Sequence, residues 1–591
     1  MKPFALLHRD GASHVELLHG DVVTVPTLAD IPLPSGTGPQ TLALIPYRQI
    51  AERGFECVDD EAPLECLRVS SVSLLPVDRV IADMPGELSV SDGAFDLDDQ
   101  TYAGIVADVL RDEIGHGEGA NFVIHRVYEA TVSGDPVDAA RAAFRRLLTG
   151  ESGAYWTFLV HTGTRTLVGA TPERHVSVAD GLVMMNPISG TYRHSDPRGL
   201  AAFLADRKEI EELHMVLDEE LKMMATVAEH GGQVVGPYLK HMAHLTHTEY
   251  LLAGRGSLDV RDVLRETMFA PTVTGSPIEN ACRVIARHER RGRGYYGGVL
   301  ALLGHDDEGR QTLDAPILIR TASISPAGEL RVPVGATLVR HSTPADEVAE
   351  THAKAAGVLA ALHGRAASGF EPPVADDAAL AARNEGLSRF WLDERTPGQP
   401  SLGRTAVIVD GEDTFTAMLT HQLRALGLSV SVVPWSAPAV PPADLLILGP
   451  GPGDPASESP KMVRLRGLAA DALESGRPIL GVCLGHQILA GVLGLPLQRR
   501  DAPYQGLARD IDLFGATRRV GFYSSFTALA GSAPGVELAA DPDGTVHALR
   551  GAGFAGVQFH PESVLSRDGM AVLGDLLPAL LERVISPSVS G

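Results

Sequence analysis

The chain has 591 residues, which is too long for a single hydrophobic core, so its length predicts two or more domains. Hydrophobic residues make up 44% and charged residues 21%, as in ordinary globular proteins, and no run of about 18 apolar residues predicts a membrane-spanning helix. The net charge of −24 argues against a nucleic-acid partner, because nucleic acids favour basic surfaces.

Residues 1–365 read as one α+β domain with large sheets. Strand-like runs, such as 155–160 and 317–319, are mixed with long helical stretches, such as 198–229. A mixture of this kind, without regular alternation of strand and helix, is typical of α+β folds.

Two pairs of carboxylates stand three residues apart in stretches that read as helices: Glu209 with Glu212, and Glu347 with Glu350. Residues at i and i+3 share a helix face, and Thr343 is placed to cap the second helix. If the two pairs face each other, their oxygens form a site of the kind that binds Mg²⁺. The alternative is two solvated acidic helix faces, and the spacing alone favours that alternative.

A connector over residues 366–402 separates the two parts of the chain. Segments 366–373 and 393–403 are rich in Pro, Gly or Ser, which interrupt regular structure. Between them, residues 387–392 are apolar enough to dock on a neighbouring surface, so we do not expect the whole connector to be disordered.

Residues 403–591 predict a doubly wound α/β domain. The strand-like runs 405–409 and 428–433 flank a helical stretch with apolar residues at helical spacing between 415 and 426. Alternation of strand, helix and strand is typical of a parallel sheet whose active site lies at the carboxyl ends of its strands.

Three motifs in this second domain predict a nucleophile with its base. Gly451 lies in a loop rich in Pro and Gly and can bring its N–H close to a substrate. Cys483 lies in Gly-Val-Cys-Leu-Gly, a nucleophile elbow with sulfur in place of oxygen, where the Leu484 N–H points at a developing oxyanion. His560 and Glu562 follow as a base and its orienting carboxylate. A buried cysteine beside an unrelated turn is the alternative, but the three motifs together favour catalysis.

The cysteines and the N-terminal stretch bear on the compartment. Four cysteines in a chain of this length do not make a disulfide framework, and none has the spacing of a zinc ligand. The apolar stretch near the first residue is too short for a signal peptide. Because a reducing compartment suits a free catalytic thiol, we expect a cytoplasmic protein.

These motifs resemble those of the class I (triad) glutamine amidotransferases over about residues 403–584. That family hydrolyses glutamine through a thioester and passes the ammonia on. The resemblance implies that Cys483 is the nucleophile, His560 its base and Glu562 the orienting group. It also implies that Gly451 and Leu484 donate to the oxyanion. The implied glutamine-binding residues are Gln487, Ser525 and Phe526. The stretch 523–526 departs from the His-Ser-Leu that relatives usually carry.

Residues from about 100 to 360 resemble the chorismate-utilising enzymes, which include anthranilate, isochorismate, aminodeoxychorismate and salicylate synthases. The supporting stretches stand in the family's order, at 168–173, 187–191, 208–212, 272–277, 293–298, 319–322 and 347–351. Joined to a glutaminase, this resemblance implies an enzyme that adds ammonia to chorismate. It implies chorismate and L-glutamine as substrates and a homodimer as the assembly.

The same resemblance assigns roles in the first domain. Glu173 matches the general acid that protonates the departing 4-hydroxyl, and such an acid wants a raised pKa in a closed site. The four paired glutamates would hold or support Mg²⁺ on the ring carboxylate. Arg320 with Tyr296 would bind the pyruvyl carboxylate. His244 matches a catalytic His of the family's active site, and the other implied pocket residues are Thr272, Gly275, Gly335 and Lys354.

One position bears on the identity of the nucleophile. Water-using relatives place a Lys, acting as a base, five residues before an Arg, and here Asn121 stands in that slot before Arg126. An amide cannot deprotonate water, whereas ammonia needs no such help. This favours delivery of ammonia at C2 and argues against isochorismate or salicylate synthesis.

Several departures from typical anthranilate synthases resemble the 2-amino-2-deoxyisochorismate synthases of phenazine pathways, which stop after amination and do not expel pyruvate. Asn186, Pro271 and Ile278 stand where Arg, Gly and Lys are usual, and 218–223 replaces Asp-Leu-x-Arg-Asn-Asp. Anthranilate synthase and 4-amino-4-deoxychorismate synthase stay open as alternatives. A catalytically inactive scaffold is the alternative of another class, and the competent residues at every proposed catalytic position argue against it.

Overall fold

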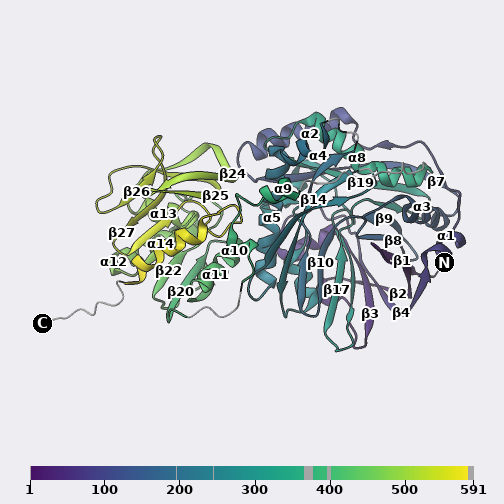
Figure 1. The fold of residues 1–591 in the computed structure, drawn as a ribbon, viewed down its shortest axis with the longest axis horizontal. Coiled ribbons are helices and arrows are strands. Elements are labelled where there is room, and N and C mark those ends of the chain that lie inside the picture. Colours follow the sequence, from purple (N-terminus) through teal and green to yellow (C-terminus); the bar gives the residue numbers. More distant parts are fainter. Residues whose placement is uncertain are drawn as a thin grey trace.

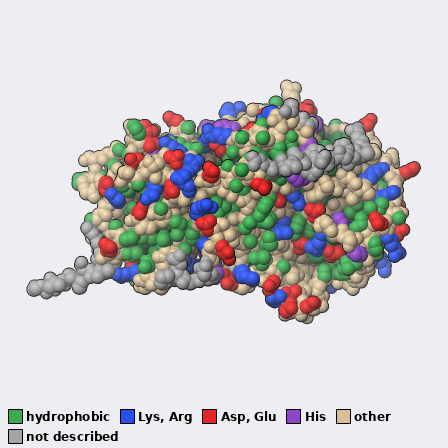
Figure 2. All heavy atoms as spheres, in the orientation of Figure 1, with side chains coloured by type: hydrophobic (Ala, Val, Ile, Leu, Met, Phe, Trp, Pro, Cys, Tyr) green, Lys and Arg blue, Asp and Glu red, His purple; other side chains and the backbone are tan. Residues whose placement is uncertain are grey.

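A computed structural model describes residues 2–194, 196, 198–243, 245–364, 377–395 and 401–582. Figure 1 shows two bodies side by side, a larger one built from the N-terminal part of the chain and a smaller one built from the C-terminal part. In Figure 2, acidic and basic side chains are interspersed over this face of both bodies, with hydrophobic side chains between them. Within the described ranges, no helix has the length and apolar character needed to cross a membrane.

The larger body is built on antiparallel strands that join edge to edge in one path, which runs β7-β19-β18-β9-β8-β1-β2-β4-β3-β16-β17-β10-β11-β14-β13. Its strands are β1 (Phe4–Arg9), β2 (His14–Val25), β3 (Gly38–Ile45), β4 (Leu64–Pro76), β5 (Ser89–Val90), β6 (Ala94–Phe95), β7 (Asn121–Ser133), β8 (Trp156–His161), β9 (Thr166–Thr171), β10 (Arg174–Ala179), β11 (Leu182–Met185), β12 (Ile188–Arg193), β13 (Gln233–His241), β14 (Leu245–Arg255), β15 (Gly275–Ser276), β16 (Val299–His305), β17 (Gln311–Pro316), β18 (Thr321–Ile324) and β19 (Glu329–Val339).

Helices cover this sheet system. They are α1 (Val77–Asp83), α2 (Asp99–Asp108), α3 (Pro136–Gly150), α4 (Gly199–Leu204), α5 (Arg207–Val227), α6 (Val260–Thr267), α7 (Ile278–Glu289) and α8 (Pro344–His363), with shorter helical turns at Leu28–Asp30, Tyr47–Arg53 and Val109–Ile114. The helix predicted over 198–229 is interrupted, because Asp206 leaves the helical path and caps α5 through the Lys208 N–H.

Strand β8 has buried side chains on both of its faces. Trp156 and Phe158 pack into an apolar layer with residues of β3 and β16, whereas Leu159, one residue on, packs against Phe144 of α3. Successive side chains of a strand point to opposite faces, so both faces of β8 are buried. The strand predicted over 155–160 is therefore confirmed.

The strand predicted over 317–319 is wrong. Strand β17 ends at Pro316, and Ile317 forms only a single bridge, to Val299. The Ile317 N–H bonds the Glu173 carbonyl at 3.1 Å, and the chain then turns into a left-handed backbone at Arg320, with φ 50°. The segment is diverted from the sheet to bring Arg320 beside Glu173.

The smaller body is the predicted doubly wound sheet, in the order β21-β20-β22-β23-β28-β27-β25-β24, with parallel pairing from β21 to β28. Helices α11 and α14 pack on one face and α12 and α13 on the other. The elements are β20 (Arg404–Asp410), α11 (Phe415–Ala425), β21 (Leu428–Pro434), β22 (Leu445–Leu448), α12 (Pro460–Ser475), β23 (Ile479–Val482), α13 (Leu484–Val492), β24 (Leu497–Leu513), β25 (Ala516–Leu529), β26 (Glu537–Ala540), β27 (Thr545–Gly551), β28 (Phe554–Val557) and α14 (Gly569–Leu581).

Part of the predicted connector lies between the two bodies in Figure 1, as α9 (Asp377–Ala382) and α10 (Arg389–Leu392). Trp391 of α10 is fully buried, and its Nε1 donates a hydrogen bond of 2.8 Å to the Glu562 carbonyl. The expectation that 387–392 docks is confirmed. Residues 365–376 and 396–400 of the connector lie outside the described residues.

Candidate active sites

The nucleophile elbow forms where β23 passes into α13. Cys483 has φ 51° and ψ −102°, a conformation that L-residues rarely adopt and that functional sites retain. A Cβ on Gly485 would lie 2.0 Å from the Leu448 carbonyl oxygen, and one on Gly481 would lie 2.5 Å from the Gly485 oxygen. Glycine is therefore required on both sides of the thiol, as the Gly-x-Cys-x-Gly spacing predicts.

His560 and Glu562 complete a buried triad with Cys483. The His560 Nδ1 lies 2.8 Å from Glu562 Oε1, and the ring interacts with the Cys483 thiol on its other side. Burial opposes a charge on the ring, but Cys483 and Glu562 outweigh it and raise the pKa of His560 well above its usual value. The arrangement supports a cysteine nucleophile paired with an imidazolium.

The predicted oxyanion and glutamine contacts surround the elbow. A Cβ on Gly451 would lie 2.2 Å from the Gly411 oxygen, so this loop also requires glycine. Leu484 begins α13, and a helix leaves the N–H groups of its first turn without intrahelical acceptors. Gln487 Nε2 donates to the Phe526 carbonyl at 2.9 Å. Ser525 Oγ donates at 3.2 Å to the Gly117 carbonyl of the larger body, so it lies at the contact between the bodies.

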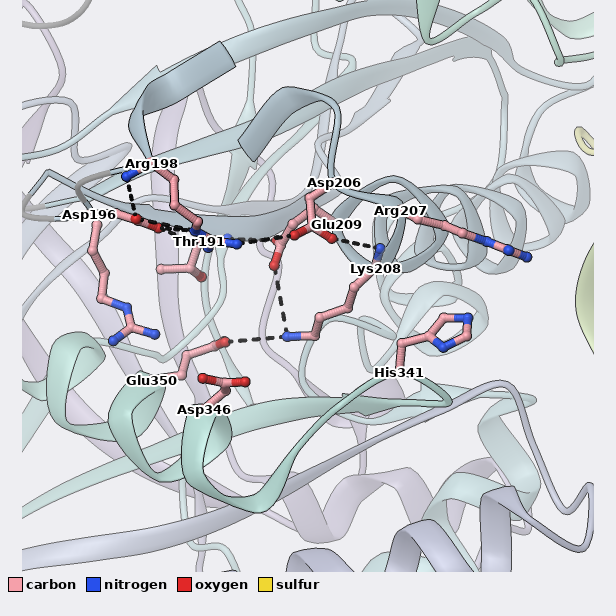
Figure 3. Close-up of a pocket in the computed structure, with 11 residues that line it drawn as sticks. Thr191, Asp196, Arg198, Asp206, Arg207, Lys208, Glu209, His341, Asp346 and Glu350 are labelled. Atoms are coloured by element: carbon pink, nitrogen blue, oxygen red, sulfur yellow. Dashed lines mark hydrogen bonds and ion pairs between the residues drawn. The ribbon is translucent and has the colours of Figure 1, made fainter. Parts of the chain in front are cut away.

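The two carboxylate pairs of helices α5 and α8 meet around one ammonium group, and Figure 3 shows one member of each pair, Glu209 and Glu350, on either side of Lys208. Lys208 reaches between them: its Nζ lies 3.1 Å from Glu347, 3.8 Å from Glu209, 3.9 Å from Glu212 and 4.0 Å from Glu350. Glu347 is fully buried and Glu212 is 4% exposed, so the alternative of two solvated acidic faces is wrong. A cavity of about 640 Å³ opens beside the cluster.

Burial and mutual repulsion control ionisation in this cluster. They raise the pKa of Glu209 to about 8 and that of Glu347 to about 7. Burial would do the same to Glu350, but the ammonium groups of Lys354 and Lys208 lower its pKa to about 2. Among the described residues, no group of three acidic, His or Cys side chains is already arranged to hold a metal ion, and the Lys208 ammonium lies between the carboxylates.

Glu173 lies in the turn between β9 and β10 and is 3% exposed. Burial raises its pKa to about 8, although Thr272, the Ile188 N–H, Lys354 and Arg320 favour the charged form. The carboxyl group is therefore largely protonated at neutral pH. A buried acid that keeps its proton is suited to protonate a leaving hydroxyl.

Several separate segments line the space near Glu173. Lys354 Nζ donates to the Gly335 carbonyl at 3.2 Å, and a Cβ on Gly335 would lie 2.4 Å from the Tyr296 hydroxyl. A Cβ on Gly275 would lie 2.3 Å from the Asn121 carbonyl. Both glycines allow close approach of neighbouring groups, in the places where the resemblance expects backbone contact with substrate.

Asn121 begins β7 and is fully buried. Neither its Oδ1 nor its Nδ2 has a hydrogen-bond partner among the described residues. A buried amide without partners is costly, so this side chain is suited to contact a bound molecule. It pairs in register with Ser276 of β15.

His244 lies outside the described residues. The structure instead brings in His247 of β14, which the sequence analysis missed: its Nδ1 bonds the Gly190 carbonyl at 2.7 Å and its Nε2 lies 3.4 Å from Arg320 Nη2. Burial and the charge of Arg320 lower the pKa of His247 to about 3, so the ring is neutral. Only the antiparallel pairing of β12 with β14 brings His247 to Gly190, and no local motif signals it.

Comparison with known proteins shows the family of each domain. The family described as chorismate binding enzyme matches residues 64–360, and class-I glutamine amidotransferase matches residues 407–578. A phenazine-specific anthranilate synthase of Pseudomonas chlororaphis is 50% identical, over 98% of this chain and 94% of its own. The phenazine-specific anthranilate synthase of Pseudomonas fluorescens is also 50% identical, over 100% of this chain and 97% of its own. The solved anthranilate synthase component I of Streptococcus pneumoniae TIGR4 is 23% identical, with a TM-score of 0.47, over 61% of this chain and 90% of that one.

The chain therefore belongs to the chorismate-binding enzymes and carries a class I glutamine amidotransferase as its second domain. The predicted fold class, an α+β domain followed by a doubly wound α/β domain, is confirmed. Within the family, the protein is a glutamine-dependent, chorismate-using aminating enzyme related to anthranilate synthase.

Proposed function

We propose that this enzyme adds ammonia to C2 of chorismate with loss of the 4-hydroxyl, giving 2-amino-2-deoxyisochorismate with its enolpyruvyl group intact. The observation that carries the proposal is Asn121, a buried amide without hydrogen-bond partners in the described part of the chain, where water-using relatives have a basic Lys. The phenazine-specific names of the full-length relatives support a role in phenazine biosynthesis.

Ammonia is produced at the triad. The Cys483 sulfur attacks the carboxamide carbon of glutamine, and the N–H groups of Gly451 and Leu484 stabilise the oxyanion. His560 protonates the departing nitrogen and then activates the water that hydrolyses the thioester, while Glu562, 2.8 Å from Nδ1, orients the ring. The products are glutamate and ammonia, and the thiol is restored.

Amination follows at the second site. The C2–N bond forms as both conjugated ring double bonds shift and the C4–O bond breaks, and Glu173 gives its proton so that hydroxide leaves as water. Attack by neutral ammonia leaves a protonated amine, so this step needs no base at Asn121. Arg320 and Tyr296 hold the pyruvyl carboxylate, and Lys354 holds the region around Gly335.

Magnesium fits the carboxylate cluster on chemical grounds. Both oxygens of Glu347 are buried, with the Lys208 ammonium 3.1 Å from one of them, and hard carboxylate oxygens are preferred ligands of Mg²⁺. Glu209, Glu212, Glu347 and Glu350 would hold or support the ion, which would supply positive charge for the ring carboxylate of chorismate. Lys208 has to move aside when the ion binds, because its ammonium lies among the same oxygens.

Ammonia crosses between the sites through buried residues. The Phe415 ring of α11 packs against the His560 ring in a tilted arrangement, with centroids 4.4 Å apart, and the Lys222 ammonium lies over the Phe415 ring at 4.5 Å. Lys222 pairs with Glu219 at 2.5 Å, and Glu219 accepts a 2.6 Å hydrogen bond from Ser276, the register partner of Asn121. These contacts link the triad to the amination site through buried side chains, which supports a route for ammonia along this part of the contact between the bodies.

The competing function is anthranilate synthase, in which the same amination is followed by loss of pyruvate. The printed names of the relatives fit either product. The test is incubation with chorismate, glutamine and Mg²⁺, with the product identified by mass and pyruvate followed by lactate dehydrogenase. We expect a non-aromatic amino acid and no pyruvate. Pyruvate formed in step with glutamate would make the enzyme an anthranilate synthase.

A further inference from the structure

We propose that Asp218, a residue of the chorismate-binding domain, is a positioning residue of the glutaminase, because its carboxylate holds the two segments that flank the Cys-His-Glu triad. The inference rests on the proposed glutaminase role of Cys483, His560 and Glu562. It does not depend on which product is made from chorismate.

The hydrogen bonds that the Asp218 carboxylate accepts lead into the smaller body, while Lys222 of its own helix is a nearby charge. Its Oδ2 accepts hydrogen bonds from the Tyr523 hydroxyl, at 2.8 Å, and from the Ser563 hydroxyl. Its Oδ1 accepts a hydrogen bond of 2.9 Å from the Val564 N–H. Asp218 is 1% exposed, and charge-assisted hydrogen bonds are strong and directional in a buried setting. One side chain of α5 thus ties together β25 and the loop after β28.

Both tied segments touch catalytic groups. The Tyr523 carbonyl lies 3.6 Å from the Cys483 sulfur, and the Tyr523 ring packs edge-on against the His560 ring, with centroids 5.6 Å apart. Ser563 and Val564 directly follow the triad carboxylate Glu562. A shift of either segment therefore moves the thiol relative to its base, or the base relative to its orienting carboxylate.

The triad loop depends on groups outside its own domain for much of its bonding. Besides Asp218, the connector supports it: Ser388 N–H donates to the Val564 carbonyl at 2.7 Å, and Trp391 Nε1 donates to the Glu562 carbonyl at 2.8 Å. From its own domain, Gly521 accepts a hydrogen bond of 2.9 Å from the His560 N–H. The loop is thus clamped between β25 on one side and the larger body with its connector on the other.

Helix α5 carries the chorismate-site carboxylates and Asp218 on different faces. Asp218 follows Glu209 by nine residues, which is about two and a half helical turns, or about 14 Å of rise. Glu209 therefore faces α8, while Asp218 faces the glutaminase on the opposite side of the same rigid rod. A change in α5 at the chorismate site reaches the triad through Asp218 without passing through a flexible segment.

The experiment compares three variants in glutamate release from glutamine, measured with the full-length enzyme. In Asp218→Leu, which keeps the branched shape with a somewhat larger side chain but cannot accept hydrogen bonds, we expect kcat to fall about 100-fold with KM changed less than about threefold. Asp218→Asn retains an acceptor for Val564 and a donor toward the two hydroxyls, so we expect most of the activity to return. His421→Phe is the matched control, because it removes the 2.8 Å hydrogen bond to the Ala225 carbonyl of α5, away from the triad.

Two further measurements keep the outcome decisive. If Asp218→Leu does not fold, the double variant Tyr523→Phe with Ser563→Ala removes the donors instead. This double variant should lower kcat, and adding Asp218→Asn to it should lower kcat no further. A wild-type kcat in a folded Asp218→Leu enzyme would overturn the proposal. An equal loss of kcat in His421→Phe would also overturn it, because Asp218 would then be only one of several contacts that dock the two bodies. If the Cys483→Ser enzyme released glutamate at the wild-type rate, the glutaminase assignment itself would fail.

Discussion

The two proposed catalytic sites of this enzyme are built in different ways. The proposed glutaminase residues come from short local motifs at the ends of neighbouring parallel strands, and glycines at Gly481 and Gly485 set the geometry of the elbow. The chorismate site draws on strands and helices far apart in the sequence, including β7, β15, β19, α5 and α8. The first site can be recognised from a few residues, whereas the second exists only when the whole antiparallel sheet system has formed.

The difference extends to electrostatics. At the triad, Cys483 and Glu562 favour the charged form of one ring. In the chorismate domain, burial instead keeps Glu173 protonated and raises the pKa values of Glu209 and Glu347. Buried carboxyl groups with raised pKa values would ionise when a cation binds beside them. The bound cation would then offset the cost of burying their negative charge and would attract an anionic substrate.

The largest expected effect separates the two sites completely. Cys483→Ser should abolish glutamine-dependent amination, by about a thousandfold or more, because a serine hydroxyl is a poor nucleophile beside a base tuned to a thiolate. Amination with ammonium salts should continue. Cys57→Ser, a change of a half-buried thiol in the other domain, is the control. Loss of both activities in a folded Cys483→Ser enzyme would contradict the division of labour.

Glu173→Gln should stop chorismate turnover from either nitrogen source, by about a hundredfold to ten-thousandfold, because an amide cannot deliver the proton. Glutamate release should persist. In the wild-type enzyme, the acid form of Glu173 is lost as the pH rises through its pKa of about 8, so chorismate turnover should decline above that pH. A profile that is flat from pH 7 to about 9.5 would remove Glu173 from the role of general acid.

Glu350→Gln or Glu212→Gln should weaken Mg²⁺ binding and chorismate turnover, each by about 10- to 100-fold, because a neutral amide is a poorer ligand for a hard cation. Calorimetric titration measures Mg²⁺ binding, and the rate of chorismate turnover at increasing Mg²⁺ concentration measures the effect on activity. Glu211→Gln, on the same helix but paired with Arg207 on the surface, is the control. Chorismate amination that is unaffected by EDTA would show that the cluster has no metal role.

The smallest expected effect concerns Asn121. Asn121→Lys should lower ammonia use about tenfold by adding bulk and charge to a fully buried position, yet it should not create an efficient isochorismate synthase, because a base also needs its orienting shell. The assay compares amination with ammonium salts and isochorismate formation in the same variant. Wild-type amination in this variant would show that Asn121 is not at the nucleophile position.

The sequence by itself determined the domain order, the doubly wound sheet and the triad, since strand–helix alternation and the Gly-x-Cys-x-Gly elbow are local patterns. It also placed Glu209 with Glu212 and Glu347 with Glu350 on single helix faces, and Thr343 does cap α8. Spacing could not decide whether these faces are solvated, because exposure depends on how α5 packs against α8.

Only the tertiary structure decided the remaining features. These features depend on chain segments that are far apart in the sequence. They are the Lys208 ammonium among four carboxylates, the left-handed turn at Arg320 and the hydrogen bond between His247 and Gly190. Asp218 reads as an ordinary acidic residue of an amphipathic helix, yet it is buried against the other domain. Partners more than 300 residues away determine its role, and helical periodicity shows only that a residue is on a face, never which surface that face will meet.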